Sequence, residues 1–457
     1  MSSSSTTAAS PASAPQLDLT PRLAACLDKH MVLPLLDFLS EKKMYDQKEL
    51  LAAKIELASK TKMVDFHAGE YKSLHGSEPA DVEAHKAAVY AELQASQSAV
   101  GPLLAILNDE NHLAEELVKE ERFNPAELEK SHGVSAHNID ALYTFAKLNF
   151  DCGRYRDSAD YLYYYRLLTR ADQPEEVEKN YQALWGKLAS EILMVNGDAA
   201  HADLIALKDA IDARSHVQPY LQLQQRAWLV TWSLFVFFNI PDGRVKMIEF
   251  MMGDSRLLNA VQTSCPHLLR YLTTAVVINR KALRSTNYSK NITKDLSRVL
   301  IAEMPNYSDP VTSFLLAVYT DFDFKRAAEA LAQCENLLQS DFFLGYSADE
   351  FMENARLMLF EAYTKIHKVI QIESVQHNQT HRRRWQPAAF TRLSMQRAPL
   401  FLRAPSTAPV DRLQRVHPHA LWRQLFLPAS PLFPSPSPFL SLPFPPRGPD
   451  DHLTPNL

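Results

Sequence analysis

The sequence contains little glycine, with 11 glycines among 457 residues, where about 7% would be typical. Sheets and phosphate-binding loops use glycine, whereas helix interiors avoid it. Alternating β patterns and the GxGxxG, GxSxG and HExxH motifs are also missing. The four cysteines stand far apart and form no CxxC pair, so they are expected to be buried reduced thiols: Cys26, Cys152, Cys265 and Cys334. These shortages favour an all-α protein without a catalytic, cofactor-binding or metal-binding motif.

Long hydrophobic runs are missing as well. The longest, Ala227 to Phe238, is too short for a bilayer, which needs about 20 residues, and it predicts a helix buried on nearly all sides. The first 16 residues are rich in Ser, Thr, Ala and Pro and lack the apolar core of a secretory signal, so they are predicted to be a disordered leader. The protein is expected in the cytoplasm, with the nucleus as an alternative.

The composition changes near Glu373. From Ser374 to Leu457 there is no Lys, Glu, Ile, Tyr or Cys, while this tail holds 15 of the 28 prolines. Ten Arg against three Asp give the tail a charge of +7, and the body carries 38 basic and 50 acidic residues, or −12. An acidic body argues against broad phosphate binding and is compatible with protein partners. The tail is predicted to be disordered.

Local signals predict a helix at almost every step of the body. Thr20 is expected to cap a helix that begins at Pro21, and Pro34 is expected to kink or restart it. Amphipathic helices are then predicted over residues 45–57 and 63–74. After a turn at Gly76, an Ala-rich helix is predicted from Val82 to Leu107.

Three later segments share one pattern, a helix, a tight turn and a second helix that opens with small residues. They cover residues 143–168, 184–211 and 314–338, with small pairs at 158/159, 199/200 and 327/328. The spacings between these pairs are close to one and three periods of about 42 residues. The pattern predicts a solenoid of helical hairpins resembling tetratricopeptide or HEAT repeats, with an irregular all-α domain as the alternative.

Three motifs invite a chemical interpretation. Cys265-Pro266-His267 could be a Cys/His pair, but Pro266 in a first turn favours a helix start. Tyr161 and residues 163–165 are expected to pack in the core, with an exposed aromatic partner site as the sharper alternative. The basic run 381–385 (HRRRW) leaves direct RNA binding or a localisation signal open.

Several blocks together resemble the family of the e subunit of eukaryotic translation initiation factor 3. The similarity runs from about Leu17 to Ile372 and is weaker over residues 76–128. The blocks that carry it are residues 17–30, 34–39, 184–194 (LWGKLASEILM), 223–226 with 228–239, 265–275 (CPHLLRYLTTA), 321–324, 341–344 and 353–357.

This resemblance implies helical repeats over 17–215 and the helical part of a PCI domain over 216–373. PCI domains are helical hairpins closed by a winged helix, and they are scaffold modules of this initiation factor, the COP9 signalosome and the proteasome lid. The resemblance therefore implies a non-catalytic scaffold subunit. Its expected partners are other PCI subunits and, mostly through them, the small ribosomal subunit. A subunit of the signalosome or the proteasome lid is the alternative.

The tail departs from the family pattern. Where a winged helix would follow, residues 374–457 supply neither its residue types nor a β-hairpin signal, so the tail is interpreted as a splice variant or a gene-model error. An assembly-defective isoform is therefore a further alternative. The helix expected over residues 349–372 would expose part of an apolar face that a winged helix would otherwise cover, made of Phe351, Ala355, Met358, Ala362, Tyr363, Ile366, Val369 and Ile370.

Overall fold

The computed structural model describes residues 17–366 apart from 78, 80, 110–112, 170–173, 215 and 282–290. The predicted leader, the predicted tail and the basic run 381–385 lie outside these residues. Throughout the described ranges the regular structure is helical and no β-strand occurs. None of the described helices is long and apolar enough to span a membrane. The predicted all-α class is confirmed.

The helices of the first half are α1 (Thr20–Ala24), α2 (Lys29–Lys42), α3 (Gln47–Ser59), α4 (Val64–His75), α5 (Val82–Leu107), α6 (Leu113–Lys119), α7 (Pro125–His132), α8 (Ala136–Asp151), α9 (Tyr155–Leu168), α10 (Pro174–Leu193) and α11 (Gly197–Ala213). Those of the second half are α12 (Pro219–Phe237), α13 (Gly243–Gly253), α14 (Ser255–Ser264), η2 (Pro266–Leu268), α15 (Leu269–Ile278), α17 (Ile292–Glu303), α18 (Pro310–Leu316), η4 (Ala317–Asp321), α19 (Phe324–Gln339), η5 (Gly345–Ser347) and α20 (Ala348–Ile366).

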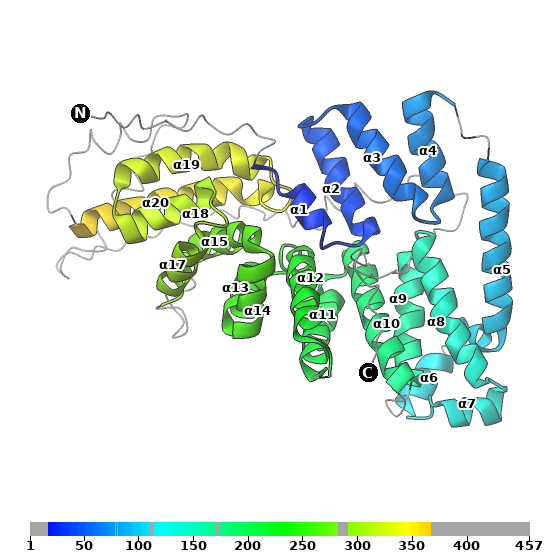
Figure 1. Ribbon diagram of the computed structural model, residues 1–457. Helices are drawn as coiled ribbons and strands as arrows, with labels where there is room; N and C mark the ends of the chain where they lie inside the picture. The colour runs from blue at the N-terminus through cyan, green and yellow to red at the C-terminus, as the bar shows by residue number, and fades with distance from the viewer. Residues whose placement is uncertain are drawn as a thin grey trace, which may run out of the picture.

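Successive helices pack as hairpins, and α8 to α12 stack in chain order, as do α18 to α20. Figure 1 shows α8 to α12 side by side, with α2 to α4 above α8 to α10 and with α18 to α20 at the opposite side of the molecule. The predicted helix–turn–helix segments correspond to α8/α9, α10/α11 and α18/α19. Small residues also bring neighbouring hairpins together, because the Oγ atoms of Ser158 in α9 and Ser190 in α10 lie 3.3 Å apart. The helical-hairpin prediction is confirmed.

The apolar run at 227–238 forms most of α12, and its residues from Leu229 to Phe237 are all buried. Trp232 packs edge-to-face on Trp185 of α10, with ring centroids 4.8 Å apart. Pairs of this geometry stabilise a core by about 0.5–1.5 kcal/mol beyond their buried area. The prediction of a helix buried on nearly all sides is confirmed.

The first helix differs from its prediction. It begins at Thr20, with Leu19 as N-cap, and it ends at Ala24. A new helix, α2, starts at Lys29 because the Asp28 side chain accepts a hydrogen bond from the backbone N–H of His30. Pro34 lies inside α2 and does not restart it. Pro34 has no backbone N–H, so α2 lacks one helical hydrogen bond. The burial of its apolar face, which includes Met31, Leu35 and Leu39, stabilises the helix by more than this loss.

The apolar face predicted at the C-terminal end of the body is largely covered by the body itself. Phe351, Ala355 and Met358 are buried, and the Phe351 ring lies 6.3 Å from that of Phe314 in α18. Of the members of this face that the structure describes, Ile366 is the most accessible, with 49% of its surface exposed. Val369 and Ile370 lie outside the described residues.

The turn between α12 and α13 requires a glycine. A Cβ atom on Gly243 would lie 2.0 Å from the carbonyl oxygen of Phe237, so the backbone would have to move. We expect Gly243→Ala to lower the free energy of unfolding by about 1–3 kcal/mol. Urea unfolding followed by circular dichroism at 222 nm measures this change.

Gly101 in α5 is the matched control, because a Cβ atom there meets nothing within 4 Å. Gly101→Ala should raise the free energy of unfolding by about 0.5–1 kcal/mol, since alanine loses less entropy in a helix. Equal effects of the two substitutions would contradict the tight packing of this turn.

Candidate functional site

Residues 17–28, here called the N-terminal segment, contact the second half of the chain. The backbone carbonyl of Cys26 accepts a hydrogen bond of 2.9 Å from the indole Nε1 of Trp232. The guanidinium carbon of Arg22 lies 5.8 Å from the centre of the Tyr307 ring. Farther along, the rings of Phe38 and Phe342 meet with centroids 5.5 Å apart. The start of the described chain therefore packs against its second half, which a solenoid contacting only its neighbours does not require.

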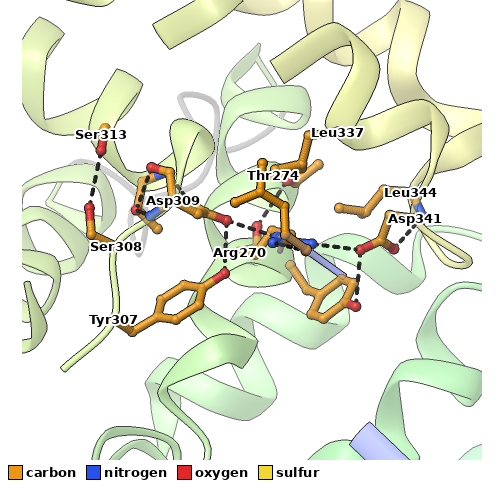
Figure 2. A network of polar contacts seen from close by, with 12 residues as sticks. Arg270, Thr274, Tyr307, Ser308, Asp309, Ser313, Leu337, Asp341 and Leu344 are labelled. Atoms are coloured by element: carbon orange, nitrogen blue, oxygen red, sulfur yellow. Dashed lines mark hydrogen bonds and ion pairs between the residues drawn. The ribbon is translucent and has the colours of Figure 1, made fainter. Parts of the chain in front are cut away.

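Arg270 is the centre of this contact. It belongs to α15, whose ten residues are all buried, and only 2% of its surface is exposed. Figure 2 shows its guanidinium between Asp309 and Asp341. Its Nε donates to Asp309 Oδ2 at 2.8 Å and its Nη1 to Asp341 Oδ2 at 3.2 Å. Its Nη2 donates to the carbonyl oxygen of Leu17 at 2.8 Å.

Each carboxylate in this junction also organises its own backbone. Asp309 is the N-cap of α18 and accepts from the N–H of Thr312 at 2.8 Å. Asp341, between α19 and η5, accepts from the N–H groups of Phe343 and Leu344 at 3.0 and 3.2 Å. Arg270 thus joins α15, the start of α18, the connection after α19 and the N-terminal segment. We call this set of contacts the Arg270 junction.

Electrostatics favour the charged form of the arginine. Burial alone would lower the pKa of Arg270, but Tyr307, Asp309 and Asp341 hold this pKa above its ordinary value. Burial raises the pKa of the Tyr271 and Tyr307 phenols. They therefore remain protonated, with Tyr271 donating to Asp341 at 3.1 Å and Tyr307 to Asp309 at 2.9 Å.

Two of the motifs that invite a chemical interpretation lie among the described residues. Pro266 and His267 form the short helix η2, as predicted for a helix start. Burial lowers the pKa of His267 to about 4, so its ring stays neutral. Tyr165 is buried and Tyr161 partly buried, whereas Tyr163 is 44% exposed. Core packing is therefore confirmed for Tyr165, and an exposed aromatic site remains open at Tyr163.

Sequence reasoning did not single out Arg270. Its signal is a lone cation in the otherwise uncharged, largely apolar helix α15, LRYLTTAVVI, because a buried charge requires partners. The two aspartates are 39 and 71 residues away from it. Spacing alone could not identify them.

An open groove of about 830 Å³ lies beside α11, α13 and the start of α14. Its walls include the apolar side chains Ile205 and Phe250. Two of its cations are already neutralised. Lys208 lies 3.0 Å from Asp254, and Arg256 lies 2.8 Å from Asp212. This pairing does not leave the groove strongly basic, so it offers little to a phosphate group.

No group of His, Cys, Asp and Glu side chains suited to a metal ion occurs in the residues that the structure describes. The described surface instead offers exposed apolar side chains suited to contact with other proteins. Two pairs stand out, Tyr163 with Leu167 on α9 and Tyr319 with Phe322 near η4.

Loss of the Arg270 charge should strongly destabilise the fold. We expect Arg270→Met to lower the free energy of unfolding by about 3–5 kcal/mol, because it leaves two buried carboxylates without a partner. It should also speed tryptic cleavage after Arg22 and Lys29, since Leu17 loses its donor. Denaturant unfolding and limited proteolysis measure the two effects.

The matched control is Arg256→Met, which removes an arginine that also pairs with two aspartates but whose side chain is 52% exposed. It should change stability by about 0–1 kcal/mol. If both variants behaved alike, the Arg270 junction would not hold the N-terminal segment in place.

Asp28 should make stability depend on pH. Burial raises the pKa of its carboxyl group to about 7, above the value of about 3.9 in an unfolded chain. Its contribution to stability is therefore present below about pH 4 and is lost as the pH rises towards 7. Asp28→Asn keeps the N-cap but cannot ionise. The free energy of unfolding of this variant, relative to that of wild type, should therefore rise by about 1–3 kcal/mol from pH 5 to pH 8.

Urea unfolding of both proteins at the two pH values measures the difference. The control is Asp46→Asn, which also alters an N-cap aspartate, at the exposed start of α3. Its effect should be nearly the same at both pH values. A pH-independent gain for Asp28→Asn would mean that its carboxyl is not buried as described.

Comparison with known proteins identifies the family. A family model described as "eIF3 subunit 6 N terminal domain" matches residues 18–149. A Bombyx mori protein, named as the E subunit of eukaryotic translation initiation factor 3, is 42% identical over 372 residues, covering 79% of this chain and 81% of the relative. Proteins of the same name match from Arabidopsis thaliana, at 38% over 385 residues (80% and 84%), and Drosophila ananassae, at 39% over 360 residues (78% and 80%).

These names agree with the resemblance found in the sequence and favour it over a subunit of the signalosome or the proteasome lid. The aligned regions cover about four-fifths of this chain and of each relative. The protein belongs to the family of the E subunit of eukaryotic translation initiation factor 3.

Proposed function

We propose that this protein is a non-catalytic scaffold subunit of translation initiation factor 3, which acts through protein–protein contacts. The observation that carries the proposal is the 42% identity, over 79% of the chain, to a relative named as the E subunit of that factor. The helical-hairpin architecture supports it, because stacked hairpins provide extended surfaces for partners. His267 and Arg270 are buried and contribute to the fold, which fits a scaffold better than an enzyme.

The proposed partners are other PCI subunits of the factor and, through them, the small ribosomal subunit in the cytoplasm. The acidic charge of −12 over residues 1–373 favours protein partners over direct contact with the phosphates of RNA. Within this proposal, residues 17–215 form the repeat region and residues 216–373 the helical part of the PCI domain. The Arg270 junction would fix the first residues of one part against the other.

We further propose that a neighbouring subunit docks at the last hairpins, where η4 and the end of α20 meet. Here Tyr319, Phe322 and Ile366 expose 36%, 54% and 49% of their surface, and we call them the last-hairpin surface. Their elements are joined by packing between η4, α19 and α20 and by the rings of Phe324 and Tyr363, 5.2 Å apart. Aromatic side chains are enriched at the energetic centres of protein interfaces.

Backbone strain at the same place supports this proposal. Phe322 has a φ of +53°, a left-handed conformation that costs an L-residue about 1–2 kcal/mol. It follows η4, a π-helical turn, and such turns occur frequently at functional sites. With more than half of its surface exposed, Phe322 gains little from packing within the chain. A function at the surface would explain an aromatic residue in this position.

The test separates binding from stability. Phe322→Gly should leave the free energy of unfolding unchanged or raise it by up to about 1 kcal/mol, because glycine relieves the left-handed strain. We expect the same variant to bind the other recombinant PCI subunits at least about tenfold more weakly. Pull-down with titrated partner concentrations measures the affinity.

Lys43→Gly is the matched control, because Lys43 is exposed and also has a φ of +53°. Lys43→Gly should have the same effect on the free energy of unfolding as Phe322→Gly, and it should leave the affinity for the other PCI subunits unchanged. If Phe322→Gly captured the partner subunits as well as wild type does, the last-hairpin surface would not be part of the interface. Absence of capture by the wild-type chain itself would contradict the proposed function.

A further inference from the structure

Two cysteines that are far apart in the sequence meet beside the Arg270 junction. The Sγ atoms of Cys26 and Cys265 lie 3.9 Å apart, although the two residues are 239 positions apart in the sequence. Cys26 belongs to the turn between α1 and α2, and Cys265 to the turn between α14 and η2. Both thiols are free. Because each stands at a helix end, its side chain is less restricted than one in a helix interior.

The two thiols differ in a way that suits sequential oxidation. Cys26 is partly exposed, whereas Cys265 is fully buried. The hydrogen bond between them lowers the pKa of Cys26 and raises that of Cys265. The thiolate is the nucleophilic form of cysteine, so Cys26 is the thiol that a small oxidant meets first. Cys265 is then in place as the resolving thiol.

The other two cysteines lack these features. Cys152 and Cys334 are both buried, and burial raises the pKa of each thiol. Among the described residues, neither has a hydrogen bond or short contact to another sulfur. They serve as internal references in the same molecule.

We propose that Cys26 and Cys265 form a reversible disulfide when the protein meets a hydroperoxide. Forming the bond brings the Sγ atoms from 3.9 Å to about 2.0 Å. This modification site is independent of the proposed role in translation, because it rests only on the placement of the two thiols.

The chemistry balances in two steps. The Cys26 sulfur attacks one oxygen of the hydroperoxide and the O–O bond breaks. Cys26 becomes a sulfenic acid, and when the oxidant is hydrogen peroxide its other oxygen departs as water. The Cys265 sulfur then attacks the Cys26 sulfur, and the hydroxyl group departs as a second water with the proton of the Cys265 thiol. Two thiols are oxidised and one peroxide is reduced. A dithiol reductant reverses the bond by exchange.

The disulfide would fasten the N-terminal segment to the helix start that leads into Arg270. The cysteines lie close to both anchors of that segment, since Trp232 binds the Cys26 carbonyl and Arg270 binds the Leu17 carbonyl. A cross-link over so many residues restricts the unfolded chain strongly. Oxidation should therefore raise the melting temperature, and reduction should return it.

Mass spectrometry of the full chain tests the proposal. The protein is treated with increasing hydrogen peroxide, blocked with iodoacetamide and digested with trypsin without reduction. Cys26 falls in peptide 23–29 and Cys265 in peptide 257–270. We expect these two peptides to become linked within one chain at lower peroxide than is needed to oxidise peptides 148–154 and 327–356, which carry the reference cysteines.

Two variants define the order of the steps. In Cys265→Ser, Cys26 should stop as a sulfenic acid that a 1,3-diketone probe captures, and the linked peptide should vanish. In the control Cys152→Ser, the linked peptide should form as in wild type. Over-oxidation of Cys26 to sulfinic acid in the wild-type chain, without the link, would overturn the proposal. So would a disulfide that forms only between two chains.

Discussion

A guanidinium group that is only 2% exposed must find its partners inside the protein, because an unpaired buried charge is among the costliest features of a fold. Arg270 meets this requirement with two carboxylates and one backbone carbonyl. These partners come from three separate segments, so the pairing can form only when all of them are in place. Apolar packing alone would tolerate small displacements, whereas hydrogen bonds from a planar guanidinium define both distance and direction.

This constraint explains how the N-terminal segment is fixed against the second half of a chain of helical hairpins. Stacked hairpins contact their neighbours and leave two free ends. Here the carbonyl of Leu17 is bound in the interior of the second half, and the indole of Trp232 holds the carbonyl of Cys26. Asp341 links the same junction to the connection between α19 and α20. Through Arg270, the same junction therefore contacts both the N-terminal segment and the connection that precedes α20.

Much of the local structure was predictable from the sequence. The helix from Val82 to Leu107 has the predicted bounds, because an Ala-rich stretch follows the turn at Gly76. The start of α2 departs from the prediction because Asp28, a strong N-cap, decides where the helix begins and Pro34 does not. The Arg270 junction could not be predicted at all. Nothing local links Leu17, Asp309 and Asp341, since their pairing exists only after the helices have packed.

Cys26 and Cys265 show the same limit for chemistry. Their separation of 239 positions favours the expectation of isolated thiols, and the absence of a CxxC pair supports it. They meet because the N-terminal segment is held in place by groups other than sulfur, namely the Trp232 indole and the Arg270 guanidinium. The thiol contact is thus a consequence of the junction. Any change that releases the segment would separate the sulfurs, so their reactivity towards each other reports whether the N-terminal segment remains attached to the second half.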